Sequence, residues 1–204
     1  MSARGSLEKD TLGQFVAEVA QRRAPDLVPA RVLDMGCGTG EQTHAYKKVW
    51  PQAKVMGLEC ARPLVRFAHG TAEANGLAID FREANAADTG LPDESVDFIT
   101  SIIMFHETTA AQTQEILKEC WRLLKPGGLV LHLDVPYHAH RIPLIKQATN
   151  DWQVRHNGEP FWTGFVELDM MAELARAGFD PDHAFADYES AGAATYFFFG
   201  GRKP

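Results

Sequence analysis

Short apolar runs alternate with amphipathic segments along the first two thirds of the chain. Runs typical of buried strands are separated by stretches whose apolar residues recur at helical spacing. The pattern predicts strands over residues 31–35, 53–59, 78–86, 95–105 and 129–135. Helices are expected over residues 7–23, 41–50, 61–76 and 113–124. This alternation indicates an α/β fold, a three-layer sandwich in which helices cover both faces of a mainly parallel sheet.

The alternation breaks after residue 135. Residues 136–165 are rich in His, Arg, Asn, Trp and Pro, and we expect them to form an insertion rather than core. A helix and two strands follow, over residues 166–179, 183–190 and 193–203. We therefore expect an N-terminal helix and connector over residues 1–30. One domain follows over residues 31–204, with a substrate-side insertion at about 136–165.

Three alternating glycines, Gly36, Gly38 and Gly40, stand between the first predicted strand and the next helix. Glycine there allows a sharp turn and lets a ligand approach the backbone. The free N–H groups at the start of a helix favour a negatively charged group. A dinucleotide fingerprint, G-x-G-x-x-G, would need a further glycine at the position of Glu41. The loop therefore argues against a dinucleotide, and a tight turn that binds nothing is the alternative.

The G-x-G-x-G spacing resembles the first motif of class I S-adenosylmethionine-dependent methyltransferases. Residues 124–135, LKPGGLVLHLDV, resemble the turn and fifth strand of that family. The resemblance covers residues 31–135 well and the last two strands weakly, and it does not extend to the insertion. It implies a Rossmann-like fold with a seven-stranded sheet and an antiparallel C-terminal hairpin strand, and S-adenosyl-L-methionine as the cofactor.

The resemblance also assigns cofactor contacts. Asp34 would help to hold the methionine ammonium. Glu59, at the end of the second strand, would accept hydrogen bonds from the ribose hydroxyls, and an ordinary surface glutamate is the alternative. The family's adenine-binding aspartate falls on Asn85, whose amide oxygen can still accept a hydrogen bond, with Asp88 as the choice if the register differs. The expected cofactor-binding residues are Asp34, Gly36, Cys37, Gly38, Gly40, Glu59, Cys60, Asn85, Ala86 and Ile103.

In this family the methyl acceptor sits beyond the end of the fourth strand, where this sequence reads SIIMFHET. His106 is the candidate catalytic residue, because the ordinary pKa of histidine suits a general base near neutral pH. The alternative is a histidine with a purely structural role. Glu107 would orient His106 or cap the next helix. The aromatic and polar side chains of the insertion suit a small-molecule pocket, or else they pack on the sheet edge. The expected substrate-binding residues are Glu107, His138, Trp152, Arg155, His156 and Trp162.

Composition narrows the range of partners. The 204 residues carry a formal net charge of −7, whereas a protein that binds nucleic acid by its phosphates needs a basic surface. No apolar run approaches the ~20 residues that span a bilayer, so no membrane partner is expected. Three scattered cysteines predict reduced thiols and a cytoplasmic location. No metal is expected, because the histidines near the acceptor form no i,i+4 pair and have no cysteine partner. A homodimer is left open.

We therefore expect methyl transfer from S-adenosylmethionine to a small-molecule acceptor. A protein or RNA methyltransferase is the second interpretation, and a non-catalytic S-adenosylmethionine-binding module is the third. The sequence leaves open the identity of the acceptor, the atom that is methylated and whether a general base takes part.

Overall fold

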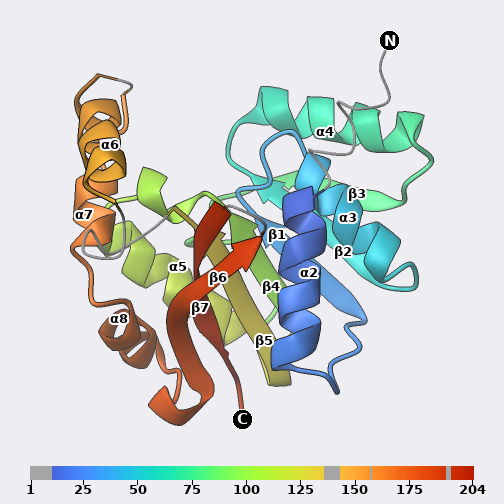
Figure 1. The fold of residues 1–204 in the computed structure, drawn as a ribbon. Helices are drawn as coiled ribbons and strands as arrows, with labels where there is room; N and C mark the ends of the chain where they lie inside the picture. Colours follow the sequence, from blue (N-terminus) through green and yellow to red (C-terminus); the bar gives the residue numbers. More distant parts are fainter. Residues whose placement is uncertain (1–10, 136–142, 157, 192–193) are drawn as a thin grey trace.

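The computed structural model describes residues 11–135, 143–156, 158–191 and 194–204. Seven strands form one sheet in the order β3-β2-β1-β4-β5-β7-β6 (Figure 1). The strands are β1 (Arg31–Met35), β2 (Lys54–Glu59), β3 (Ile79–Glu83), β4 (Val96–Ile102), β5 (Leu124–Asp134), β6 (Ala184–Ala191) and β7 (Ala194–Arg202). Strands β1 to β5 are parallel, and β7 pairs antiparallel with both β5 and β6. The predicted Rossmann-like sheet with its antiparallel C-terminal hairpin is confirmed.

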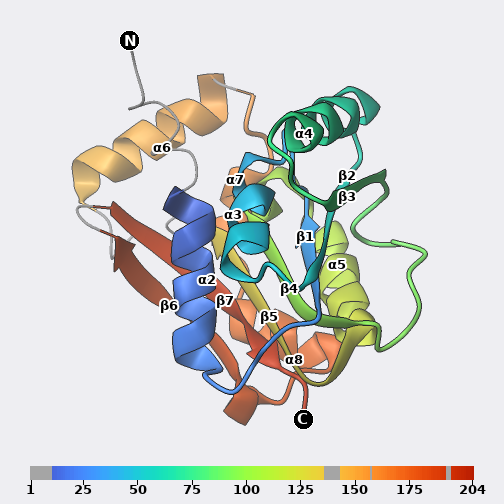
Figure 2. The same cartoon turned by 90° about the vertical axis from the view of Figure 1, so that its right-hand side faces the viewer.

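Helices lie on both faces of this sheet and beyond its edge. The described helices are α2 (Thr11–Arg23), α3 (Glu41–Val49), α4 (Arg62–Ala74), α5 (Ala110–Leu123), α6 (Leu144–His156), α7 (Trp162–Val166) and α8 (Met170–Ala177), with the short 3-10 helices η1 (Phe105–Glu107) and η3 (Pro181–His183). Helices α2, α3 and α4 lie on one face, and α5 and α8 lie on the other (Figures 1 and 2). Each face has its own buried apolar core. In the part of the chain that the structure describes, no helix is long and apolar enough to span a bilayer.

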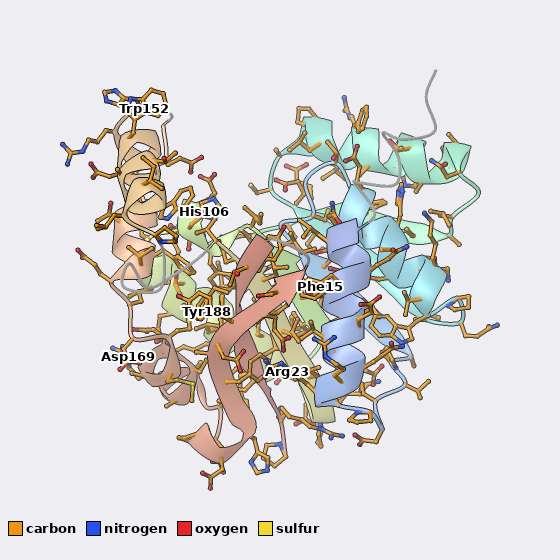
Figure 3. The ribbon with its side chains drawn as sticks, viewed as in Figure 1. Phe15, Arg23, His106, Trp152, Asp169 and Tyr188 are labelled. Atoms are coloured by element: carbon orange, nitrogen blue, oxygen red, sulfur yellow. The ribbon has the colours of Figure 1, made fainter. Side chains whose placement is uncertain are left out.

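Helix α2 packs against the C-terminal hairpin. The ring of Phe15 meets that of Phe198 edge to face, with 5.5 Å between ring centroids. Arg23 donates a hydrogen bond to Asp187 at 2.6 Å, and its guanidinium lies 4.0 Å from the centre of the Phe185 ring. Partly exposed ion pairs contribute little by themselves, so the aromatic and cation–π contacts carry much of this interface. Figure 3 shows Phe15 and Arg23 along the helix beside these strands.

Several elements differ from the expectation. The helix expected from residue 113 begins at Ala110, because Thr109 and Gln112 form a capping box in which each side chain binds the other's backbone N–H. The prediction of a turn at residues 125–128, KPGG, is wrong. These residues belong to the start of β5, where the register with β4 shifts. The segment expected as an insertion contains the helices α6 and α7.

The fourth strand ends at Ile102, three residues before its expected end, because the backbone turns at Ile103. Ile103 has a φ of 56°, a left-handed conformation that is strained for a β-branched residue. Its N–H donates to the carbonyl of Leu133 at 2.8 Å, and η1 follows. The carboxyl ends of β1 and β4 therefore meet where the strand order reverses, which is the ligand-binding edge of α/β sheets.

Candidate active site

The glycine loop follows β1 and turns the chain into α3. Gly36, Gly38 and Gly40 have φ angles of 63°, 54° and 78°, all in the left-handed region. A Cβ on Gly36 would lie 2.6 Å from the Met104 sulfur, and one on Gly40 would lie 2.6 Å from the Phe81 ring. A Cβ on Gly38 would meet nothing within 4 Å. The outer glycines therefore allow close packing, whereas Gly38 borders open space that a ligand can enter.

Asp34 lies beneath this loop and is buried, with 2% of its surface exposed. Its carboxylate accepts a hydrogen bond from the Thr43 hydroxyl at 2.6 Å. Burial raises the pKa of Asp34 to about 7, although the Thr43 hydrogen bond acts in the opposite direction. A carboxyl with this pKa exchanges its proton near neutral pH and would be ionised by a cationic partner.

Glu59 ends β2 and connects two loops of the site. One carboxylate oxygen accepts from the N–H of Gly38 at 3.1 Å, and the other accepts from the N–H of Ala61 at 2.9 Å and from the Cys60 thiol at 3.3 Å. An ionised carboxylate has about four acceptor positions. Three of these positions are filled, so the side chain fixes the glycine loop and keeps about one acceptor position for a further donor.

A cavity of about 500 Å³ opens beside these residues. It contains six of the ten predicted cofactor-binding residues, which are Gly36, Glu59, Cys60, Asn85, Ala86 and Ile103. Met104 and Glu107 also line it. A larger cavity, of about 750 Å³, lies at the amino ends of β1 to β3 and is lined by residues such as Arg31 and Lys54. We assign the cofactor to the first cavity, because open α/β sheets bind ligands at the carboxyl ends of their strands.

The loop between β3 and β4 forms one wall of this cavity. The side-chain oxygen of Asn85 accepts from the N–H of Ala87 at 2.9 Å. Farther along, the N–H and hydroxyl of Thr89 donate to Glu119 of α5 at 2.9 and 2.6 Å. Glu119 thus anchors the expected adenine-binding loop to the helix below it.

His106 is paired with Asp134, the last residue of β5. Its Nδ1 lies 2.7 Å from one carboxylate oxygen of Asp134. That carboxylate also accepts from the backbone N–H groups of Val135 at 2.7 Å, Phe105 at 2.8 Å and Met104 at 3.2 Å. A carboxylate surrounded by donors is an acceptor, so Nδ1 carries the proton and Nε2 is left with a lone pair. The pair fixes both the ring orientation and its tautomer.

The free edge of His106 faces two carboxylates. Its Nε2 lies 3.7 Å from Glu107 and 3.8 Å from Glu159, and the ring of Trp162 packs beside it at 5.1 Å between centroids. Burial opposes the imidazolium, but the hydrogen bond and charge of Asp134, with the charges of Glu107 and Glu159, raise the pKa of His106. Burial and the neighbouring Glu159 raise the pKa of Glu107. The acceptor end of the cavity is therefore strongly acidic.

Of the predicted substrate-binding residues, the structure brings Glu107 and Trp162 to His106 and leaves those on α6 apart from it. Trp152 is 56% exposed and packs on His156 of the same helix, with 5.2 Å between centroids. Arg155 is exposed and pairs with an aspartate one turn earlier. Figure 3 shows Trp152 at the outer end of α6, away from His106. His138 lies outside the described residues.

Reasoning from the sequence missed Asp134, which was interpreted only as part of a strand. It included Glu159 among the polar residues of the insertion but did not place it beside His106. Register carries the signal for Asp134: Ile102 pairs with Leu133 across β4 and β5, so the next residue of β5 faces the turn that carries His106. No local pattern brings Glu159 to this site, because it comes from the turn between α6 and α7.

Comparison with known proteins shows what the first two thirds of the chain are similar to. Residues 32–128 match the family model of a methyltransferase domain. Demethylmenaquinone methyltransferase from Thermus thermophilus is 38% identical over 120 residues, which cover 57% of this chain and 54% of that protein. Ribosomal RNA small subunit methyltransferase C from Hahella chejuensis is 34% identical over 126 residues, 59% of this chain and 36% of that protein. The chain spans about half or less of the length of these relatives.

Solved structures agree on the fold. A SAM-dependent methyltransferase from Aquifex aeolicus superposes with a TM-score of 0.63 at 20% sequence identity, covering 94% of this chain and 92% of that one. The segment over residues 32–128 supports a class I methyltransferase domain, and the structure from Aquifex aeolicus shows the same fold. The resemblance seen in the glycine loop is thereby confirmed, and with it S-adenosylmethionine as the cofactor of the class.

Proposed function

We propose that this protein transfers a methyl group from S-adenosylmethionine to a small-molecule acceptor. One observation carries the proposal: the cavity lined by Gly36, Glu59 and Asn85 ends at Glu107, beside the His106–Asp134 pair. A volume of about 500 Å³ lies within the range of cofactor sites. The open space at Gly38 suits a ligand that touches the loop backbone.

In this assignment each strand end holds one part of the cofactor. Asp34 pairs with the methionine ammonium, the remaining acceptor position of Glu59 receives a ribose hydroxyl, and the loop at Asn85 and Ala86 contacts the adenine. Ile103 forms the wall beside the sulfonium. The strained backbone at Ile103 supports this placement, because such strain concentrates at functional sites.

The cofactor supplies an activated methyl group on a sulfonium, so the protein mainly aligns the acceptor and excludes water. His106 contacts the acceptor side of the cavity, either taking a proton or orienting the acceptor. Asp134 holds the imidazole ring in place for both roles. The ring of Trp162 packs beside His106, which supports a substrate-side role for this residue of the insertion.

Two features support a small-molecule acceptor. The net charge of −7 disfavours nucleic acid. The relative from Thermus thermophilus is named for a quinone-type acceptor. The relative from Hahella chejuensis, which is named for ribosomal RNA, keeps an RNA acceptor as the second candidate.

A cytoplasmic location agrees with the free thiols of Cys37, Cys60 and Cys120, and a homodimer stays a prediction.

Calorimetry with S-adenosylhomocysteine tests the cofactor assignment, and NAD serves as the control. Incubation with the cofactor and a metabolite extract, or with RNA, followed by mass spectrometry for the gain of one CH2 unit, tests the transfer. We expect S-adenosylhomocysteine to bind and a small metabolite to gain the methyl group. Tight NAD binding without S-adenosylhomocysteine binding would refute the proposal. Methylation of RNA alone would favour the second candidate, and binding without any transfer would favour a non-catalytic module.

A further inference from the structure

Three side chains that can act as metal ligands, those of His106, Glu107 and Glu159, lie close together at the acceptor end of the cavity. His106 and Glu107 come from η1, and Glu159 comes from the turn between α6 and α7. One ligand atom from each lies within 4.8 Å of the other two. The Nε2 atom of His106 is 3.7 Å from Glu107 and 3.8 Å from Glu159. Because Glu159 is far from the other two along the chain, the spacing of these residues does not reveal the group.

His106 is prepared as a metal ligand. Its Nδ1–H is held by Asp134 at 2.7 Å, which leaves the lone pair of Nε2 directed toward the two glutamates. A carboxylate that fixes the second nitrogen of a histidine is the usual partner of a metal-bound imidazole, because it sets the tautomer and raises the basicity of the ligand. The side chain of Asp134 is fully buried, so this partner is rigid.

Glu159 provides an independent observation. Its Oε2 atom is buried and, among the described residues, has no hydrogen-bond partner. A buried carboxylate oxygen without a partner is unfavourable by more than a kcal/mol. The 3.8 Å to Nε2 exceeds hydrogen-bond length, so a protonated His106 would not satisfy this atom. A cation between Glu159, Glu107 and His106 would satisfy all three.

The distances favour a metal ion over an organic ammonium. A metal at about 2.1 Å from its ligands holds two of them about 3.4 Å apart in tetrahedral geometry and at most about 4.2 Å apart. An ammonium with hydrogen bonds of about 2.8 Å would separate its acceptors by about 4.6 Å. The observed 3.7 and 3.8 Å are closer to the metal values. Glu107 is half-exposed, so its side chain can move inward to complete the set.

We propose that His106, Glu107 and Glu159 bind one divalent transition-metal ion, Zn²⁺ or Mn²⁺, which contacts an oxygen of the methyl acceptor. One imidazole and two carboxylates suit these ions better than Mg²⁺, and three protein ligands leave coordination positions open. Glu107 also lines the cofactor cavity, so the ion lies beside it. With the ion bound, Nε2 of His106 is a ligand and takes no proton. The ion would instead lower the pKa of a bound hydroxyl and fix its oxygen in place. The metal site stands by itself, whereas the acceptor contact rests on the proposed function.

Metal binding to the full chain tests this inference directly. The protein is freed of metal with a chelator, dialysed and titrated with Co²⁺, whose visible absorption reports coordination by the protein. Zn²⁺ is then added as a competitor, and Mn²⁺ binding is followed by electron paramagnetic resonance. We expect one ion per chain. Glu159→Gln should weaken binding by roughly 10- to 100-fold. Glu115→Gln, an exposed carboxylate of α5, is the matched control and should leave binding unchanged.

Circular dichroism and binding of S-adenosylhomocysteine are measured on every variant. An unchanged affinity for S-adenosylhomocysteine shows that the Glu159→Gln variant is folded. Glu107→Gln alters a half-exposed side chain and gives a second test of metal binding. Absence of binding for Co²⁺, Zn²⁺ and Mn²⁺ would overturn the metal site. Binding that survives both substitutions, or saturable binding of an alkylammonium without any metal binding, would overturn it as well. Metal binding without S-adenosylhomocysteine binding would instead refute the proposed function.

Discussion

The buried carboxyl of Asp34 makes a quantitative prediction about cofactor binding. Burial raises its pKa from the ordinary 3.8 to about 7, so this acid is half protonated near neutral pH in the free protein. If Asp34 pairs with the methionine ammonium, the bound state requires the carboxylate. Binding must then release a proton whenever Asp34 starts protonated. The affinity for the cofactor should therefore fall as the pH falls through 7. The folding stability of the free protein has the opposite dependence, because the stability due to the neutral Asp34 is lost as the pH rises through its folded-state pKa of about 7.

The size of the effect follows from the pKa. With a value of about 7 for Asp34, the dissociation constant should be about tenfold higher at pH 6 than at pH 8, a difference of about 1.4 kcal/mol. Binding at pH 6 should release about 0.9 proton, and binding at pH 8 about 0.1 proton. Burial raises the pKa values of the nearby Cys37 and Tyr46, so neither of them titrates in this range.

Calorimetry with S-adenosylhomocysteine at pH 6, 7 and 8, in buffers of different ionisation enthalpy, measures both quantities. Thr43→Val provides the sharper variant, because it removes the hydrogen bond that favours the Asp34 carboxylate. A hydrogen bond to a charged group contributes about 1.5–3 kcal/mol, so the pH midpoint should rise by roughly one to two units. Asp34→Asn should abolish the dependence. A dissociation constant that stays flat between pH 6 and 8, or a dependence that survives Asp34→Asn, would refute this reasoning.

Three further predictions concern other parts of the site. Glu59→Gln should weaken S-adenosylhomocysteine binding by about 10- to 100-fold in calorimetry, with an unchanged circular dichroism spectrum, since the ribose hydroxyls lose a charged acceptor; an unchanged Kd would show that the ribose lies elsewhere. Trp162→Ala should raise the KM for the acceptor and spare cofactor affinity, and equal damage to both would mean that the ring is only structural. Gly40→Ala should lower Tm by several degrees, because the new Cβ would lie 2.6 Å from the Phe81 ring at a φ of 78°. Gly70→Ala, in the open interior of α4, is its control and should raise Tm, since alanine favours a helix by about 1 kcal/mol.

The parallel part of the fold could be predicted because its signals are local. Each strand is an apolar run bounded by turn residues, and the three glycines ending at Gly40 mark the first crossover. The left-handed turn at Ile103 could not be predicted, because isoleucine disfavours that conformation and tertiary contacts impose it. Helix α6 was not predicted, because its apolar residues do not form a buried stripe: Leu144, Ile145 and Trp152 are all exposed. Periodicity identifies only helices that bury one face.

The candidate site divides in the same way. The cofactor side is built from residues at strand ends, such as Glu59, which sequence position alone identifies. The acceptor side depends on pairings across the sheet and on a distant turn. Asp134 reaches His106 through the register of β4 and β5, and Glu159 reaches it through the packing of α7 against η1. Such long-range contacts leave no periodic trace in a single sequence.

The interface between α2 and the C-terminal hairpin also has a consequence for how the chain folds during synthesis. Phe15 and Arg23 leave the ribosome long before Asp187 and Phe198, the residues on which they pack. Contacts between residues far apart in sequence form slowly, and they cannot form before the later partner has been made. Helix α2 is therefore synthesised early and packs late, with its apolar face open to water in the interval. A chaperone that shields this face, or a partner that aggregates through it, would act on the nascent chain and have no access to the finished fold.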